Sequence, residues 1–140
     1  MRNSRQRQII ETIIRQRMDH PTAAEVCADA HQFDETISLA TVYRNLNLMV
    51  EQGKLNKLHM LDGVDHFDPI LDNHSHFYCK KCKKISNIKL RKSKLNRLRL
   101  EASNNIKIDN IQTVVTGTCQ NCSKESLHIL SSTCYNKCII

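Results

Sequence analysis

The strongest constraint on this chain is a pair of Cys-x2-Cys motifs. Cys79 and Cys82 form the first pair, and Cys119 and Cys122 form the second. Four thiolates in two such pairs match the ligand set of a tetrahedral structural zinc site. Pairs so far apart in sequence meet only when a sheet has formed, so metal binding and folding would be coupled. The sequence therefore predicts one structural Zn²⁺ held by Cys79, Cys82, Cys119 and Cys122.

The remaining cysteine usage favours metal ligation over disulfides. The chain has seven cysteines, an odd count, and its beginning, MRNSRQRQII, lacks the long apolar core of a signal peptide. We therefore expect a cytoplasmic protein with reduced thiols. Cys27 fits a small buried residue, while Cys134 and Cys138 suit either an incidental tail or a redox pair. Catalytic thiol-redox use of the Cys-x2-Cys pairs is an alternative, which predicts an accessible cysteine of low pKa.

Charge and length bound the class of protein. The 140 residues fit one domain or two small ones, and no apolar run approaches a membrane helix. Lys and Arg number 21 against 14 Asp and Glu, a formal net charge of +7. Such a balance favours a polyanionic partner such as nucleic acid, and we do not expect an enzyme.

The first 30 residues predict two helices. Ser4 can cap the first, whose apolar side chains recur at helical spacing, and Thr22-Ala-Ala-Glu25 forms a capping box that starts the second. The predicted buried residues are Ile9, Ile10, Ile13, Ile14 and Met18 in the first helix, and Val26 and Ala30 in the second.

A third helix is predicted from Ser38, as N-cap, to Gly53, as its left-handed terminator. Leu39, Val42, Tyr43, Leu46, Met49 and Val50 can pack inward, which leaves Thr41, Arg44, Asn45 and Leu48 on the other side. A helix, a turn and a polar-faced helix form a helix-turn-helix, whose last helix enters the major groove. A plain three-helix bundle is the alternative. The predicted DNA contacts are Ser38, Thr41, Tyr43, Arg44 and Asn45.

Residues 54–67 predict a hairpin around Asp62-Gly63, which would add a wing to the helices. Lys54 and Lys57 suit contacts with the phosphate backbone, although a solvated hairpin face explains them almost as well. Beyond it, strands are expected at 74–78, 83–90 and 106–116, and a basic helix at 91–103 with Leu95, Leu98 and Ala102 inward. The predicted fold class is α+β.

A second set of candidate ligands, with nitrogen and oxygen atoms in place of sulfur, predicts a second metal site. His74 and His76 lie two apart on a predicted strand and so share one face, while His20 and Asp68 come from the preceding half. Three imidazoles and a carboxylate suit Fe(II), Mn(II) or Zn(II). Such a metal would fix the angle between the halves, and in a dimer it would switch DNA affinity.

Taken together, these residues resemble the Fur family of metal-dependent transcriptional repressors. The matching motifs are Ser38-Leu-Ala-Thr-Val-Tyr-Arg-Asn-Leu46, His74-Ser-His76-Phe-Tyr-Cys79-Lys-Lys-Cys82 and Gly117-Thr-Cys119-Gln-Asn-Cys122. The resemblance implies a winged-helix DNA-binding domain at 1–68 and an α/β dimerisation and metal-binding domain at 69–140. It also implies a homodimer that binds AT-rich inverted repeats in double-stranded DNA.

Within the family, the ligand spacing is closest to the peroxide-sensing PerR members. This likeness implies a regulatory Fe(II) or Mn(II) at His20, Asp68, His74, His76 and a fifth position, where Asn87 stands instead of a carboxylate. It implies that peroxide oxidises His20 or His74 and releases the repressor from DNA. Asp72 is an alternative candidate for the fifth ligand, and a metal-responsive iron, zinc or manganese regulator is the alternative function.

The leading helix of longer family members is expected to be absent, because the chain begins roughly where their second helix begins. DNA binding would then depend more on Arg2, Arg5 and Arg7.

Overall fold

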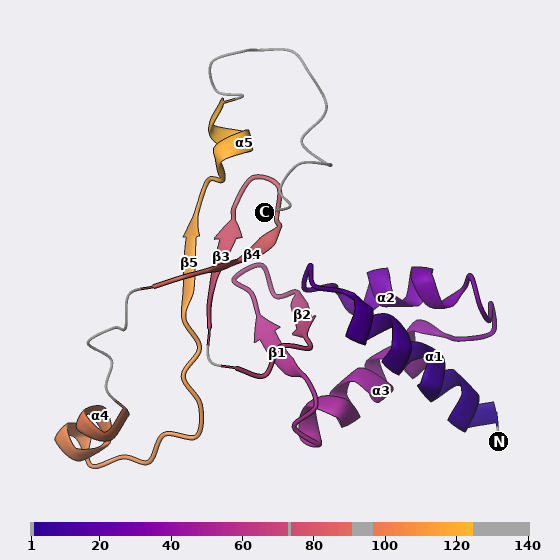
Figure 1. Ribbon diagram of the computed structural model, residues 1–140, viewed down its shortest axis with the longest axis horizontal. Helices are drawn as coiled ribbons and strands as arrows, with labels where there is room; N and C mark the ends of the chain where they lie inside the picture. The colour runs from indigo at the N-terminus through magenta and orange to yellow at the C-terminus, as the bar shows by residue number, and fades with distance from the viewer. Residues whose placement is uncertain (1, 73, 91–96, 125–140) are drawn as a thin grey trace. The chain divides into compact units, whose positions relative to one another are not determined.

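The computed structural model describes residues 2–72, 74–90 and 97–124, with side-chain detail from residue 5 onward. The chain forms two compact units, which divide between Asp72 and Asn73 (Figure 1). Cys134, Cys138 and Leu95 fall outside the described residues. Among the helices described, none is long and apolar enough to cross a membrane.

Helix α1 spans Arg2–Gln16 and packs one apolar side into the first unit. Ile10 and Ile14 are fully buried, Ile13 is nearly so, and Ile9 is half-buried. Ser4 lies inside this helix, so its expected role as N-cap is wrong. The expectation for Met18 is also wrong, because the helix ends before it and leaves its side chain 65% exposed.

Helix α2, Ala23–Ala30, begins at the predicted capping box. Thr22 Oγ1 accepts a hydrogen bond from the Glu25 backbone N–H (3.3 Å), and Glu25 Oε2 accepts one from the Thr22 N–H (2.7 Å). The two bonds satisfy donors that a helix start otherwise leaves unpaired. Val26 and Ala30 are buried as predicted.

Helix α3, Leu39–Glu51, carries the predicted N-cap, because Ser38 Oγ accepts a hydrogen bond from the Thr41 N–H (3.2 Å). Gly53 follows the helix with a φ of 68°, a conformation that glycine adopts without steric cost. Val42, Leu46 and Met49 are buried.

Two of the predicted inward residues of α3 are instead exposed. Leu39 is 45% exposed and Tyr43 is 38% exposed. Tyr43 stands about 100° around the helix from Val42, since an α-helix has 3.6 residues per turn. Leu39 is the first residue of the helix and lies about one turn before Val42, the first buried residue. The buried line of α3 is therefore narrower than the apolar pattern indicated.

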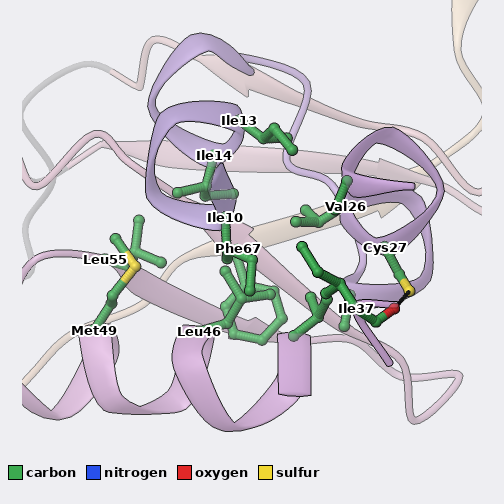
Figure 2. Close-up of a cluster of buried hydrophobic side chains, with 13 residues drawn as sticks. Ile10, Ile13, Ile14, Val26, Cys27, Ile37, Leu46, Met49, Leu55 and Phe67 are labelled. Atoms are coloured by element: carbon green, nitrogen blue, oxygen red, sulfur yellow. Dashed lines mark hydrogen bonds between the residues drawn. The ribbon is translucent and has the colours of Figure 1, made fainter. Parts of the chain in front are cut away.

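The core of the first unit joins the three helices to the hairpin. Figure 2 shows Phe67, which is fully buried, among side chains that include Ile10, Ile14 and Leu46. The full cluster is Ile10, Ile13, Ile14, Ala23, Val26, Cys27, Ala30, Ile37, Val42, Leu46, Met49, Leu55 and Phe67. The hairpin is thus part of the same hydrophobic core as the helices.

The hairpin itself matches the prediction. Strands β1, Asn56–His59, and β2, Asp65–Asp68, pair antiparallel with Lys57 opposite Phe67. Gly63 has a φ of 79°, and its N–H donates to the Met60 carbonyl (3.0 Å) to close the turn. The first unit is therefore a winged helix-turn-helix.

The second unit contains a three-stranded sheet in the order β4-β3-β5. Strand β3, Ser75–Cys79, pairs antiparallel with β4, Ile85–Ile88, and parallel with β5, Val114–Gly117. Helix α4 spans Arg97–Asn104, and a short helix α5, Gln120–Lys124, follows β5. The mixed helix and sheet content confirms the predicted α+β class.

Several expectations for this unit are corrected. Strand β5 has only four residues, not the whole of 106–116, and α5 was not predicted. Leu98 is 74% exposed and Ala102 is exposed, although both were expected inward. Among its described residues helix α4 has none that is fully buried, although Leu100 is half-buried.

Replacing Ile14 by Ala tests the core of the first unit. Ile14 is fully buried, so its truncation is expected to cost about 2–5 kcal/mol in the free energy of unfolding. The matched control is Ile9→Ala on the same helix, whose half-buried side chain should give a clearly smaller loss. Urea titrations followed by far-UV circular dichroism measure both, and equal losses would contradict the described packing.

Candidate metal centres and nucleic-acid interface

The two cysteine pairs are brought together by the parallel pairing of β3 with β5. In this register Cys79 lies opposite Gly117, so the chain leaves both strands at the same edge of the sheet. The Lys80 N–H donates to the Gly117 carbonyl (2.8 Å), which extends the pairing one residue further. The first pair begins with the last residue of β3 and the second follows β5, so both occupy this edge.

The four sulfur atoms have the geometry of a zinc cluster. One sulfur from each of the four cysteines lies within 4.8 Å of the others, and Cys82 Sγ is 3.9 Å from Cys119 Sγ. A tetrahedron with Zn–S bonds of about 2.3 Å has sulfur–sulfur edges of about 3.8 Å. Cys79 and Cys122 are both 1% exposed. The cluster can therefore hold a zinc ion, as the sequence predicted.

Backbone N–H groups prepare one of the thiols for metal binding. Burial raises the pKa of Cys79, but hydrogen bonds from the backbone N–H groups of Cys119, Cys82 and Lys81 outweigh it and lower the pKa to about 6. The Cys119 N–H, for example, lies 3.4 Å from Cys79 Sγ. The thiolate, which is the form that binds metal, is thus favoured near neutral pH.

Packing at Gly117 and a short helix set the positions of Cys119 and Cys122. A Cβ on Gly117 would lie 3.2 Å from the Phe77 ring, so only glycine lets β5 approach this ring without displacement. Helix α5 then turns the chain, and the Ser123 N–H donates to the Cys119 carbonyl (2.9 Å). Cys119 and Cys122 lie about one helical turn apart and can face the same ion. Sequence spacing identified the thiols but not the helix that orients them.

In the first unit the structure brings His20 and Asp68 together. His20 Nε2 lies 3.6 Å from Asp68 Oδ2, with side chains 2% and 1% exposed. The other Asp68 oxygen, Oδ1, accepts a hydrogen bond from the Ile70 N–H (2.9 Å). A buried imidazole beside a buried carboxylate offers nitrogen and oxygen ligands to a divalent metal.

Main-chain pairing explains how two residues 48 positions apart meet. Thr22 forms a β-bridge with His66, and the Phe67 N–H donates to the Pro21 carbonyl (2.9 Å). His66 Nδ1 lies 2.7 Å from the His20 carbonyl, while His20 itself has a φ of 56°. His66 was not predicted to have this role. In the sequence, only the alternation of polar and apolar residues in the hairpin indicated that the His66 side chain could face the interior.

In the second unit His74 and His76 lie side by side. Their ring centroids are 4.4 Å apart, and His76 is 4% exposed. His76 lies opposite Asn87 of the antiparallel β4, so both side chains point to the same face of the sheet. Asn87 is exposed. The register thus sets the amide of Asn87 beside His76, where the resemblance had implied a fifth ligand.

The predicted DNA contacts lie at the start of α3. Arg44 is exposed, and its Nη2 donates to Thr41 Oγ1 (3.3 Å). Asn45 Nδ2 donates to the Thr41 carbonyl (2.8 Å), and Tyr43 and Ser38 are also exposed. These side chains offer donors of the kind that contact base edges and phosphates.

The wing is held against α3 by a side chain expected to contact phosphate. Lys57 Nζ donates to Asn47 Oδ1 of α3 (3.1 Å) and pairs with Asp65 Oδ2 (2.9 Å). Burial raises the pKa of Asp65, but hydrogen bonds from His59 and Lys57 outweigh it and hold the pKa below its ordinary value. Lys57 therefore braces the wing, and Lys54, which is exposed, better suits a phosphate contact.

Comparison with known sequences identifies close counterparts. The profile of the ferric uptake regulator family matches residues 1–116. The peroxide operon regulator of Bacillus subtilis is 30% identical over 113 residues, covering 79% of this chain and 77% of that protein. A ferric uptake regulation protein of Brucella abortus is 37% identical over 68 residues, covering 49% of this chain and 48% of that protein.

Solved structures give the same result for the fold. A peroxide stress regulator of Campylobacter jejuni aligns with a TM-score of 0.70 at 27% identity, covering 86% of this chain and 91% of that one. The Helicobacter pylori ferric uptake regulator aligns with a TM-score of 0.72 at 19% identity, covering 85% and 80% of the two chains. The latter likeness concerns the fold alone.

Acidification is expected to release zinc. Because the folded pKa of Cys79 lies below the ordinary value of 9.0, its thiolate stabilises the folded unit fully above pH 9. This contribution declines as the pH falls and is lost below about 6. A chromogenic chelator should therefore detect faster zinc release as the pH falls, with the midpoint below about 6 because bound Zn²⁺ competes with protons for the thiolates.

Serine substitutions supply the comparison for the zinc experiment. Cys79→Ser should bind zinc weakly throughout the range, whereas Cys27→Ser, in the other unit, should retain it. Full zinc content in the Cys79 variant would refute the four-cysteine centre.

Proposed function

We propose a function from the premise that this chain belongs to the ferric uptake regulator family, whose profile covers most of its length. It is a metal-responsive regulator, and we infer that it represses transcription and senses peroxide. The observation that carries this proposal is the buried His20–Asp68 pair in the winged-helix unit, matched by the His74–His76 pair in the zinc-cluster unit. Each unit offers half of a ligand set suited to Fe(II) or Mn(II).

DNA binding is assigned to residues 1–68 and dimerisation to 69–140. Ser38, Thr41, Tyr43, Arg44 and Asn45 would contact double-stranded DNA in the major groove, while Lys54 contacts its backbone. A homodimer would set two such helices on an AT-rich inverted repeat, with half-sites about one helical turn apart. The exposed α3 side chains and the braced wing support this assignment. The regulator would act in the cytoplasm.

The proposed regulatory ligands are His20, Asp68, His74, His76 and Asn87. Each pair is already formed within its own unit, and Asp68 is held by the Ile70 N–H. A metal bound to both pairs would link the orientation of the DNA-binding unit to that of the second unit. Its occupancy would therefore change the affinity for an operator that two recognition helices must contact together.

Peroxide sensing follows from the imidazole ligands. These residues would hold Fe(II), which when bound would supply the electrons that activate hydrogen peroxide. In the net reaction one oxygen atom of the peroxide is added to a ligand imidazole, His20 or His74, and the other leaves as water. An oxidised imidazole is a poorer ligand, so metal binding would weaken and the repressor would leave DNA. Mn(II), which activates peroxide poorly, would support DNA binding without this response.

Asn87 favours a second candidate function. An amide oxygen can bind a divalent metal but contributes no negative charge, so the proposed site holds Fe(II) less tightly than a site with two carboxylates. A weaker site suits a regulator whose signal is the metal concentration itself, such as an iron, zinc or manganese uptake regulator. The 30% identity to a peroxide operon regulator favours peroxide sensing.

Arg44→Ala tests the recognition helix. Removing one exposed guanidinium from the base-contacting turn should weaken operator binding by about 1–3 kcal/mol, roughly ten- to hundredfold, without changing zinc content. Operator fragments for the fluorescence anisotropy assay come from selection with the metal-loaded protein. Arg15→Ala is the control, because Arg15 on α1 already pairs with Glu11 (2.6 Å). Equal effects of the two variants would contradict the assignment.

Anaerobic loading separates the two candidate functions. Protein loaded with Fe(II) or with Mn(II) receives a brief hydrogen peroxide pulse, and DNA binding and peptide masses are then measured. Peroxide sensing predicts one added oxygen on His20 or His74 and lost DNA binding with Fe(II) only. Unmodified histidines and unchanged binding with both metals would instead favour a metal-concentration sensor.

A further inference from the structure

The positive charge of this chain is concentrated in the unit that lacks the recognition helix. Residues 73–140 hold 13 of the 21 Lys and Arg but only 3 of the 14 Asp and Glu, a formal net charge of +10. Residues 1–72 hold the other 8 basic and 11 acidic residues, a net charge of −3. The winged-helix unit therefore has no net positive charge to attract DNA at long range, whereas the second unit has a large one.

We infer that the first cysteine pair carries a second DNA-binding surface, the knuckle lysines, formed by Lys80, Lys81, Lys83, Lys84 and Lys124. The inference rests on the proposed DNA-binding function. Lys80, Lys81, Lys83 and Lys124 are exposed and Lys84 is half-buried. Lys81 Nζ donates to the Cys122 carbonyl (3.4 Å), which brings this turn next to the helix that ends with Lys124.

A rigid backbone presents the knuckle lysines. The Lys83 N–H donates to the Cys79 carbonyl (2.8 Å), and the Cys79 N–H donates to the Lys84 carbonyl (3.0 Å). Lys83 has a φ of 63° and its ammonium lies 5.9 Å from the centre of the Tyr78 ring. Ammonium groups held on a fixed turn lose little backbone freedom when they meet phosphates.

Charge compensation of the zinc centre does not account for the whole cluster. Zn²⁺ with four thiolates carries a net charge of −2. The five knuckle lysines exceed this by three positive charges, and residues 73–100 contain ten Lys or Arg with no Asp or Glu. The remaining charge suits a polyanion. Duplex DNA is the partner to which we commit, because the recognition helix already brings it to the same molecule.

Neutralising three of the lysines tests the inference. The variant combines Lys80→Gln, Lys83→Gln and Lys124→Gln and leaves out Lys81, which contacts the second pair. The probe is a labelled random-sequence duplex of about 30 base pairs, titrated by anisotropy from about 50 to about 200 mM NaCl. We expect the slope of log affinity against log salt to shrink by about 2 to 3, and the affinity at the lower salt to fall on the order of a thousandfold.

The matched control replaces the same three residues by Arg, which keeps the charge and should keep both affinity and slope. Zinc content is measured in every protein, and Lys80→Gln alone, with an expected slope change of about 1, serves if the triple variant folds poorly. An unchanged slope, or zinc loss as the only effect, would overturn the inference. Tighter binding to single-stranded RNA than to the duplex would also overturn it. Random DNA requires neither operator nor regulatory metal, so failure of the repressor proposal would leave this result unaffected.

Discussion

The parallel pairing of β3 with β5 is the interaction on which the second unit depends. It joins strands that are separated by β4 and α4 in sequence, and a parallel pair requires such a crossover. Without it Cys79 and Cys119 would lie on unrelated segments. Because β5 has only four residues, it forms few hydrogen bonds with β3. The four cysteines lie at or directly beyond the last paired residues, Cys79 and Gly117, at this end of the sheet. We therefore expect the sheet and the zinc-bound cluster to form together.

In the first unit a single β-bridge also brings together residues that are far apart in sequence. The segment before α2 lies along β2 through the Thr22–His66 bridge, and this sets His20 beside Asp68. His20 adopts a left-handed backbone conformation that is uncommon for residues other than glycine. The hydrogen bond from His66 to its carbonyl holds it there. A main-chain contact, not sequence proximity, thus brings together His20 and Asp68 in the first unit and the two cysteine pairs in the second.

Local signals in the sequence predicted much of this structure, and long-range packing explains what they missed. Caps at Thr22 and Ser38 and the turn at Gly63 depend on neighbouring residues only, so their patterns are reliable. Burial of Leu39, Tyr43 and Leu98 depends on what other elements cover, which an apolar pattern does not encode. The zinc cluster was predictable because its spacing is itself the signal. The bracing role of Lys57 was not, because it requires Asn47 and Asp65 to be placed first.

The brace between Lys57, Asn47 and Asp65 also bears on the entropy of recognition. It connects α3 to the hairpin in the absence of nucleic acid. Phe67 of the same hairpin is fully buried in the hydrophobic core of the first unit. A surface that is ordered in advance loses little conformational freedom on binding, so more of each contact's energy appears as affinity. In the proposed complex, the brace would therefore present α3 and the hairpin to the duplex in one fixed arrangement.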